Sequence, residues 1–180
     1  MPTRLLDFIL ADETYGFDKT RLYDVGHSLG GFVCGQLTGR RPELRGGVLL
    51  MPCDIGTIPL PEREHHHAYQ TIREVMEESA RRLNGTTGEA LLREAAENNE
   101  TFRLESVAAE MAEKPILCVA GSLDVYTPPD FHCAPLARAI RTVGGTQFQS
   151  VVYPTDHFFA DYRLTVSNVV TEFLTGLMSR

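Results

Sequence analysis

Two short, unbroken apolar runs constrain the fold of this 180-residue chain more than any other feature. They are residues 47–51 (GVLLM) and 115–121 (PILCVAG). An apolar run without alternation predicts a strand that is buried on both faces, as in a parallel sheet covered by helices. Residues 21–25 and 148–153 are further short runs with the composition of strands.

Helical patterns separate these strands. We predict helices over residues 3–11, 29–38, 129–143 and 162–178. In the last one, apolar residues recur at spacings of three and four: Val166, Val169, Val170, Phe173, Leu174 and Leu177. Strands that alternate with helices predict an α/β fold with a parallel sheet of about four strands flanked by helices.

The segment 61–112 has a different character, because it lacks any strand pattern and is rich in charged helical sequence. One helix is indicated by apolar residues at helical spacing: Ala68, Ile72, Val75, Met76, Ala80 and Leu83. Thr86 and Glu89 match a capping box that would begin a second helix. We therefore predict an α/β core over residues 1–60 and 113–180, with a helical cap or lid inserted over residues 61–112.

Composition excludes several classes of protein. The formal net charge is −7 and no run is rich in Lys or Arg, so we expect neither nucleic acid nor a membrane surface as a partner. No apolar stretch approaches the roughly 20 residues that span a bilayer. Residues 1–10 do not resemble a signal peptide. Four cysteines without metal-ligand spacing suggest reduced thiols, so we expect a cytoplasmic protein.

The pentapeptide Gly26-His27-Ser28-Leu29-Gly30 matches the pattern G-x-S-x-G between a predicted strand and a predicted helix. This context is typical of a tight turn that raises a nucleophilic serine above the edge of a sheet. We expect the two glycines to be required because the turn leaves no room for side chains. Ser28 is the candidate nucleophile, and the backbone N–H of Leu29 would face a developing oxyanion.

A serine hydroxyl needs an oriented base, and two residues are placed to provide one. Asp124 follows the strand 115–121, and His157 follows the strand 148–153. The carboxyl ends of parallel strands are where open α/β sheets place their sites. We predict that His157 accepts the Ser28 proton while Asp124 fixes the imidazole tautomer.

Other residues compete for these roles. Asp54 follows the strand 47–51 and is an alternative acid, although the loop context favours Asp124. Asp156 and Asp161 flank His157 and are interpreted as turn and helix-cap residues. His132 falls inside the helix predicted after Asp124, and we expect it at the surface.

No cofactor is expected, because the sequence contains no dinucleotide fingerprint, no P-loop and no metal-ligand set. His65, His66 and His67 are consecutive. On a helix they point about 100° apart, so they cannot all face one ion. We interpret them as part of a solvated face of the cap, and we predict no metal.

Three segments together resemble the α/β-hydrolase superfamily: RLYDVGHSLGGFVCGQL, KPILCVAGSLDVYTPP and VVYPTDHFFADYRLTVSNVVTEFL. They are similar to its nucleophile elbow, acid strand and histidine loop. Within that superfamily the chain is most similar to dienelactone-hydrolase and acyl-peptidase-like serine hydrolases with a helical cap. The resemblance implies hydrolysis of an ester or related acyl bond in a small-molecule substrate. It assigns Ser28 as nucleophile, Asp124 as acid, His157 as base and the Leu29 N–H as an oxyanion donor.

The sequence departs from the family before the elbow. Members have several strands ahead of the nucleophile strand, and one of their loops supplies a second oxyanion N–H. Here only residues 1–20 precede the strand, so the chain resembles the C-terminal half of a longer hydrolase. Strand 21–25 would then be an exposed sheet edge that favours homo-oligomers. Three hypotheses follow: an active serine esterase, a weak or inactive remnant that acts by association, and an acyl-peptidase.

Overall fold

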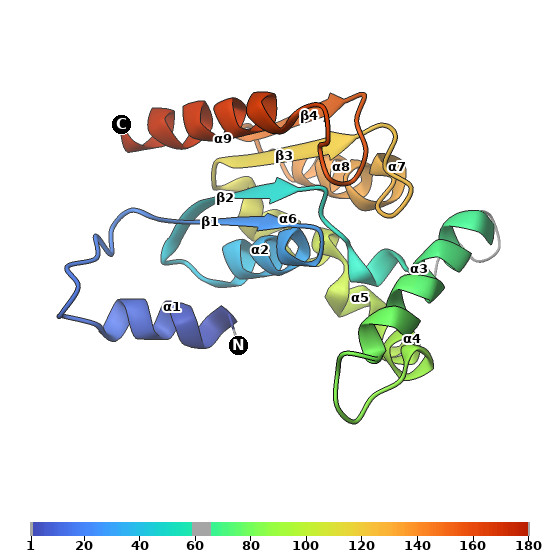
Figure 1. Cartoon of the computed structure of the whole chain (residues 1–180). Helices are drawn as coiled ribbons and strands as arrows, with labels where there is room; N and C mark the ends of the chain where they lie inside the picture. Colours follow the sequence, from blue (N-terminus) through green and yellow to red (C-terminus); the bar gives the residue numbers. More distant parts are fainter. Residues whose placement is uncertain (1, 59–65, 180) are drawn as a thin grey trace.

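The computed structural model describes residues 2–58 and 66–179, and these form a four-stranded sheet flanked by helices (Figure 1). All neighbouring strands are parallel, in the order β1-β2-β3-β4. The strands are β1 (Leu22–His27), β2 (Leu44–Leu50), β3 (Ile116–Gly121) and β4 (Phe148–Tyr153). The predicted α/β fold with a parallel sheet is confirmed.

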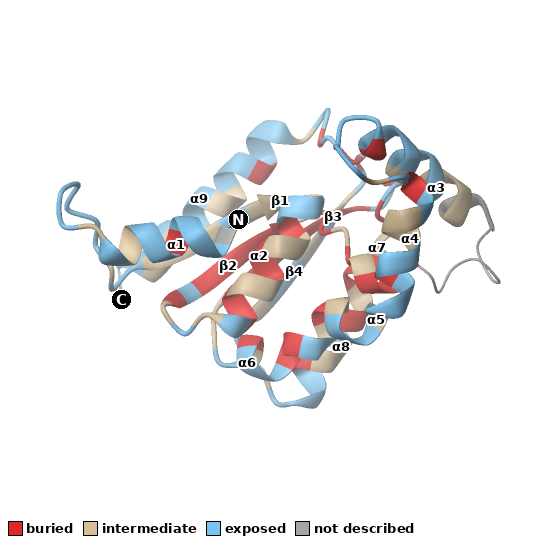
Figure 2. Ribbon diagram, turned by 90° about the horizontal axis from the view of Figure 1, so that it is seen from below, coloured by how far each residue is buried: buried red, intermediate tan, exposed pale blue. Residues whose placement is uncertain are grey.

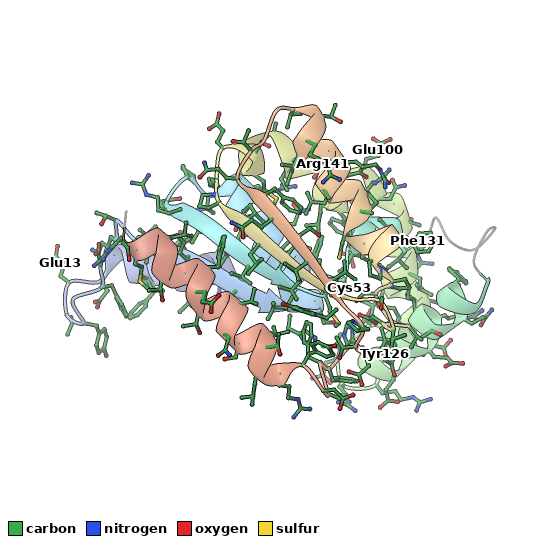
Figure 3. All side chains as sticks on the ribbon, turned by 90° about the horizontal axis from the view of Figure 1, so that it is seen from above. Glu13, Cys53, Glu100, Tyr126, Phe131 and Arg141 are labelled. Carbon is green, nitrogen blue, oxygen red and sulfur yellow. The ribbon has the colours of Figure 1, made fainter. Side chains whose placement is uncertain are left out.

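Helices cover both faces of the sheet. Three of them lie on one face (Figure 2): α2 (Leu29–Arg40), α6 (Ala108–Ala112) and α8 (Ala134–Thr142). Helix α9 (Arg163–Met178) crosses the opposite face (Figure 3). Helix α1 (Pro2–Ala11) lies on the α2 side of the sheet, where Arg41 Nη2 pairs with Asp7 Oδ1 at 2.8 Å. No helix in the described ranges is both long and apolar enough to cross a membrane.

The buried strands alternate between two apolar cores, as period-two geometry requires. Leu49 and Cys118 belong to the core beneath α2, α6 and α8. Val48 and Val119 belong to the core beneath α9. The predicted face of α9 packs on this second core through Val166, Val169, Val170, Phe173 and Leu174. The uninterrupted apolar runs in the sequence are therefore explained by burial on both faces.

Between β2 and β3 the described residues contain only helices and loops. Helices α3 (His66–Ala80) and α4 (Gly88–Glu97) pack on each other beyond the carboxyl ends of the strands (Figure 1). Three shorter elements are η1 (Ile55–Thr57), α5 (Asn99–Phe102) and η2 (Leu104–Val107). Leu104 and Val107 of η2, with Met111 of α6, are buried in the core under the sheet.

The helix predicted over residues 129–143 is two helices, which corrects the prediction. Helix α7 (Pro129–His132) is followed by α8, with Cys133 between them. Pro135 is the second residue of α8. Proline has no N–H and its ring clashes with the carbonyl four residues earlier, so one continuous helix is excluded here.

Two predicted boundaries also differ from the structure. Strand β1 extends through His27, because Gly26 and His27 remain paired with Leu49 and Leu50 of β2. Helix α4 is capped by Thr87, whose hydroxyl accepts from the Ala90 N–H at 3.1 Å. With Thr87 as the N-cap, Glu89 is the second helical residue and Ala90 the third, so the capping box predicted from Thr86 and Glu89 does not form.

Candidate active site

The residues predicted to carry chemistry lie at one edge of the sheet. Ser28 follows β1, Asp124 follows β3 and His157 follows β4. Since the strands are parallel, their carboxyl ends share this edge. Ser28 and His157 line the same cavity, which has a volume of about 600 Å³. Among the described residues no hydrogen bond joins Ser28 to His157, and such contacts often tighten only when substrate binds.

Ser28 occupies a strained turn between β1 and α2. Its backbone angles are φ 57° and ψ −121°, with φ in a region that residues other than glycine seldom adopt. Such conformations cost about 1–3 kcal/mol and cluster at active sites. The Ser28 N–H donates to the Leu50 carbonyl at 2.9 Å, and the Cys53 N–H donates to the Ser28 carbonyl at 2.9 Å. These bonds hold the turn against the end of β2 and the loop that follows it.

The two glycines of the motif have different surroundings. A Cβ atom on Gly26 would overlap the carbonyl of Gly30, so no side chain fits there. At Gly30 itself a Cβ atom would meet nothing within 4 Å, which corrects the expectation that both positions lack room. The second close approach is at Gly31, where a Cβ atom would lie 2.9 Å from the Cα of Pro52.

Leu29 begins α2, so its backbone N–H is one of the four that an α-helix leaves without an intrahelical partner. The positive end of the helix dipole lies at the same place. This is the position expected for an N–H that faces an oxyanion. Leu29 is 54% exposed, so it does not belong to the apolar core.

Asp124 and His157 form a buried hydrogen-bonded pair. His157 Nδ1 lies 2.7 Å from Asp124 Oδ2, and the two residues are 7% and 4% exposed. Asp124 Oδ1 accepts from the N–H groups of Tyr126 and Thr127 at 2.8 and 2.9 Å. Burial by itself would raise the pKa of Asp124, but the hydrogen bonds from His157 and Thr127 outweigh it and lower that pKa. Asp124 is thereby held as a carboxylate.

His27 supports the histidine loop, a role that the motif did not indicate. Its Nε2 lies 2.8 Å from the backbone carbonyl of His157 and must donate, because a carbonyl only accepts. The rings of His27 and His157 have centroids 4.8 Å apart. The ring of Tyr126 also packs against the ring of His157, and the two centroids are 5.3 Å apart. The imidazole of His157 is therefore held by contacts from the end of β1 and from the loop that follows β3.

The alternative acid, Asp54, has other partners. It is fully buried, and its carboxylate accepts from the N–H groups of Gly56 at 3.2 Å and Leu104 at 3.1 Å. Burial raises the pKa of Asp54 to about 7. Asp54 thus caps η1 and anchors η2, whereas the carboxylate that contacts His157 is that of Asp124.

His132 was expected at the surface and is 1% exposed, so that prediction is wrong. The break between α7 and α8 turns it inward, where its Nδ1 lies 3.2 Å from the Thr57 hydroxyl. Burial lowers the pKa of His132 to about 4, so the imidazole is neutral near pH 7. A single histidine in a helical pattern gives no signal of such burial.

Asp156 closes a turn, as predicted, because its Oδ1 accepts from the N–H groups of Phe158 and Ala160 at 3.0 and 3.1 Å. The N-cap of α9 is Tyr162 rather than Asp161.

The histidine run predicted to be a solvated face of the cap falls at the start of α3. His65 lies outside the described residues, and the positions of the next two are described only as the start of that helix. Within the ranges 2–58 and 66–179, no group of three or more His, Cys, Asp or Glu residues is arranged to hold a metal ion.

The remaining cavity wall is mostly apolar. Helix α3 contributes Ile72, Val75 and Met76, which share one helical face. Tyr126 and Phe158 complete the wall beside the histidine, and Tyr126 lies at the carboxyl ends of the strands (Figure 3). The charged side chains of Glu78 and Arg82 also line the cavity, and they form an ion pair with Arg82 Nη2 3.3 Å from Glu78 Oε1.

Comparison with known proteins identifies the class of fold. No protein-family model matches the sequence, and no curated protein is significantly similar to it. Solved structures do match. Est1E from Butyrivibrio proteoclasticus has a TM-score of 0.67 at 18% identity, covering 99% of this chain and 69% of that protein. Porphyromonas gingivalis dipeptidyl peptidase 4 has a TM-score of 0.68 at 15% identity, covering 97% of this chain and 22% of that protein.

The Pyrococcus furiosus esterase Pf2001 matches with a TM-score of 0.58 at 13% identity, over 86% of this chain. The match covers 53% of that esterase, so this chain spans about half its length. A serine turn, a buried Asp–His pair and a parallel sheet define an α/β protein with its candidate site at the strand ends. More particularly, the chain has the α/β-hydrolase fold, as its sequence resemblance indicated.

Proposed function

We propose that this protein is a serine hydrolase that cleaves an ester or related acyl bond. The observation that carries the proposal is the buried Asp124–His157 pair at 2.7 Å, in which His157 shares a cavity with Ser28. Ser28 Oγ would attack the acyl carbonyl while His157 Nε2 takes its proton. His157 would return that proton to the leaving group. Water, activated by the same imidazole, would then hydrolyse the acyl-enzyme.

The oxyanion of the tetrahedral intermediate would be stabilised by the Leu29 N–H at the start of α2. A second donor is not assigned among the described residues. Loss of one such donor costs about 10²–10³-fold in rate in studied enzymes. The proposal is therefore compatible with slow turnover, and a catalytically weak or inactive remnant that acts by association is the alternative.

The direct test is covalent labelling of Ser28. Incubation with a fluorophosphonate is expected to add one adduct to the wild-type protein, because a serine activated by a histidine base displaces fluoride from the probe and becomes phosphonylated. The Ser28→Ala variant should gain none. Intact mass spectrometry reads both results, and circular dichroism confirms that both samples are folded. A folded wild-type protein that remains unlabelled would contradict the proposal and favour the remnant.

We also propose that α3 and α4 act as a cap and that the apolar wall of the cavity receives an apolar group of the substrate. Ile72, Val75 and Met76 present hydrocarbon to the space in front of Ser28. Similar folds include an esterase and a dipeptidyl peptidase. Since the triad would serve both reactions, a panel of p-nitrophenyl esters and N-acyl peptides distinguishes them.

Val75→Trp is expected to narrow this cavity, since Val75 is 39% exposed and lines it without being part of the apolar core. The ratio of kcat/KM for an octanoyl ester to that for an acetyl ester should fall by about tenfold or more, because each methylene in an apolar pocket contributes about 1–3 kcal/mol. Glu74→Gln, at a position of the same helix that does not line this cavity, is the matched control. An unchanged ratio in Val75→Trp would show that the acyl group binds elsewhere.

A further inference from the structure

Thr127 makes a set of contacts at Asp124 that the reaction above does not use. It is 2% exposed, and its hydroxyl oxygen lies 2.5 Å from Asp124 Oδ2. The same hydroxyl oxygen lies 3.4 Å from the Met51 carbonyl and 3.3 Å from His157 Nδ1. A threonine hydroxyl carries one proton. That proton goes to the Asp124 carboxylate, which is the shortest contact and the only charged acceptor of the three.

Counting donors shows what this bond does to the carboxylate. Oδ1 accepts from two backbone N–H groups, those of Tyr126 and Thr127. Oδ2 accepts from the Thr127 hydroxyl at 2.5 Å and from His157 Nδ1 at 2.7 Å. A carboxylate offers about four lone-pair positions, so all of them are occupied. The Thr127 hydroxyl therefore shares with His157 the one oxygen that would stabilise an imidazolium ion.

We propose that Thr127 is a positioning residue of this site, whose hydroxyl weakens Asp124 Oδ2 as an acceptor and so lowers the proton affinity of the Asp124–His157 pair. The proposal rests on the proposed function for its catalytic meaning. A base must be unprotonated to accept a proton, so lower proton affinity keeps the pair competent at lower pH. The hydroxyl also holds Oδ2 within hydrogen-bond distance of Nδ1, which keeps the imidazole oriented.

Other ionisable groups near the pair are independent of Thr127. His27 contacts the His157 loop from β1, and Tyr126 packs on the His157 ring. His132 in α7 interacts with Asp124 and His157, but burial lowers its pKa to about 4, so it stays neutral near pH 7. Cys53 lines the cavity, and burial raises the pKa of its thiol to about 12, so it is also neutral. The charged side chains that line the cavity are those of Glu78 and Arg82. Comparing variants at position 127 leaves all of these unchanged, so the difference isolates the hydroxyl group.

The test compares Thr127→Val, which removes the hydroxyl, with Thr127→Ser, which keeps it. In Thr127→Val the acid limb of the kcat/KM profile for a p-nitrophenyl ester is expected to move to higher pH by about 0.5–1, as the pair's macroscopic titration shifts. At pH values below the midpoint of the acid limb, kcat/KM of Thr127→Val should be up to about tenfold lower than that of the wild type. Thr127→Ser should restore the wild-type midpoint. If Thr127→Val does not fold, Thr127→Ala takes its place.

A role in packing alone predicts a different result: kcat would fall equally at every pH in Thr127→Val, and the midpoint would not move. That result would overturn the proposal. A second readout needs no turnover. The ring C–H resonance of His157, assigned by its loss in His157→Asn, should titrate with a higher midpoint in Thr127→Val than in wild type. This readout stays available if fluorophosphonate labelling fails, so the two proposals can fail separately.

Discussion

Replacing Asp124 by asparagine is expected to lower kcat for ester hydrolysis by about 10⁴-fold without unfolding the protein. The reason lies in the direction of the donors. The N–H groups of Tyr126 and Thr127 point at Oδ1, so the asparagine carbonyl must occupy that position. Its NH₂ group then faces His157 Nδ1, which has to accept rather than donate. The proton is forced onto Nε2, and the imidazole can no longer take a proton from Ser28.

Asp54→Asn is the matched control, because the sequence left Asp54 open as the acid. The carboxylate of Asp54 bonds to the N–H groups of Gly56 and Leu104. We expect the folded Asp54→Asn protein to keep its labelling rate and its kcat. The two variants are compared by initial rates and by the rate of fluorophosphonate labelling. Equal losses in both variants, or a loss only in Asp54→Asn, would remove Asp124 from the proposed triad.

Gly26→Ala is expected to lower the free energy of unfolding by about 3 kcal/mol, at the upper end of the usual cost of overpacking. The added Cβ atom would overlap the Gly30 carbonyl and lie 2.7 Å from the Gly31 nitrogen. Both contacts are with backbone, so relief requires the turn that holds Ser28 to open. Urea denaturation gives the change directly through the transition midpoint.

Gly30→Ala provides the contrast within the same pentapeptide. Gly30 is the second residue of α2, and a Cβ atom there meets nothing within 4 Å. Alanine is favoured over glycine in a helix interior by about 0.5–1 kcal/mol and by less in the first turn, so this variant should be as stable as the wild type or slightly more stable. If Gly30→Ala proves as damaging as Gly26→Ala, the described geometry of the turn is wrong.

The sheet could be predicted from the sequence because burial on both faces leaves a direct record in residues 47–51 and 115–121. The chain order of Ser28, Asp124 and His157 was also readable, since each follows a strand and parallel strands end at one edge. The face of α9 was predicted for a similar reason, because helical spacing records which side is buried.

Other features depend on contacts between distant segments and left no local pattern. His132 is buried because α7 ends after one turn and directs it toward Thr57. Thr127 gives the same signal as any threonine in a turn, and its contact with His157 exists only once β3 and β4 are side by side. The difference between Gly26 and Gly30 likewise follows from the path of the folded turn rather than from the motif.

The three residues of the proposed triad follow three different strands, so the site can form only when those strands are paired. Ser28 is carried by β1, Asp124 by β3 and His157 by β4, so the set spans the whole width of the sheet from one edge strand to the other. No local fragment contains all three. Under the proposed function, reactivity toward a fluorophosphonate therefore reports whether the complete sheet is folded. A chain in which either outer strand is unpaired would lose its reactivity toward the probe even while most of its helices remain folded.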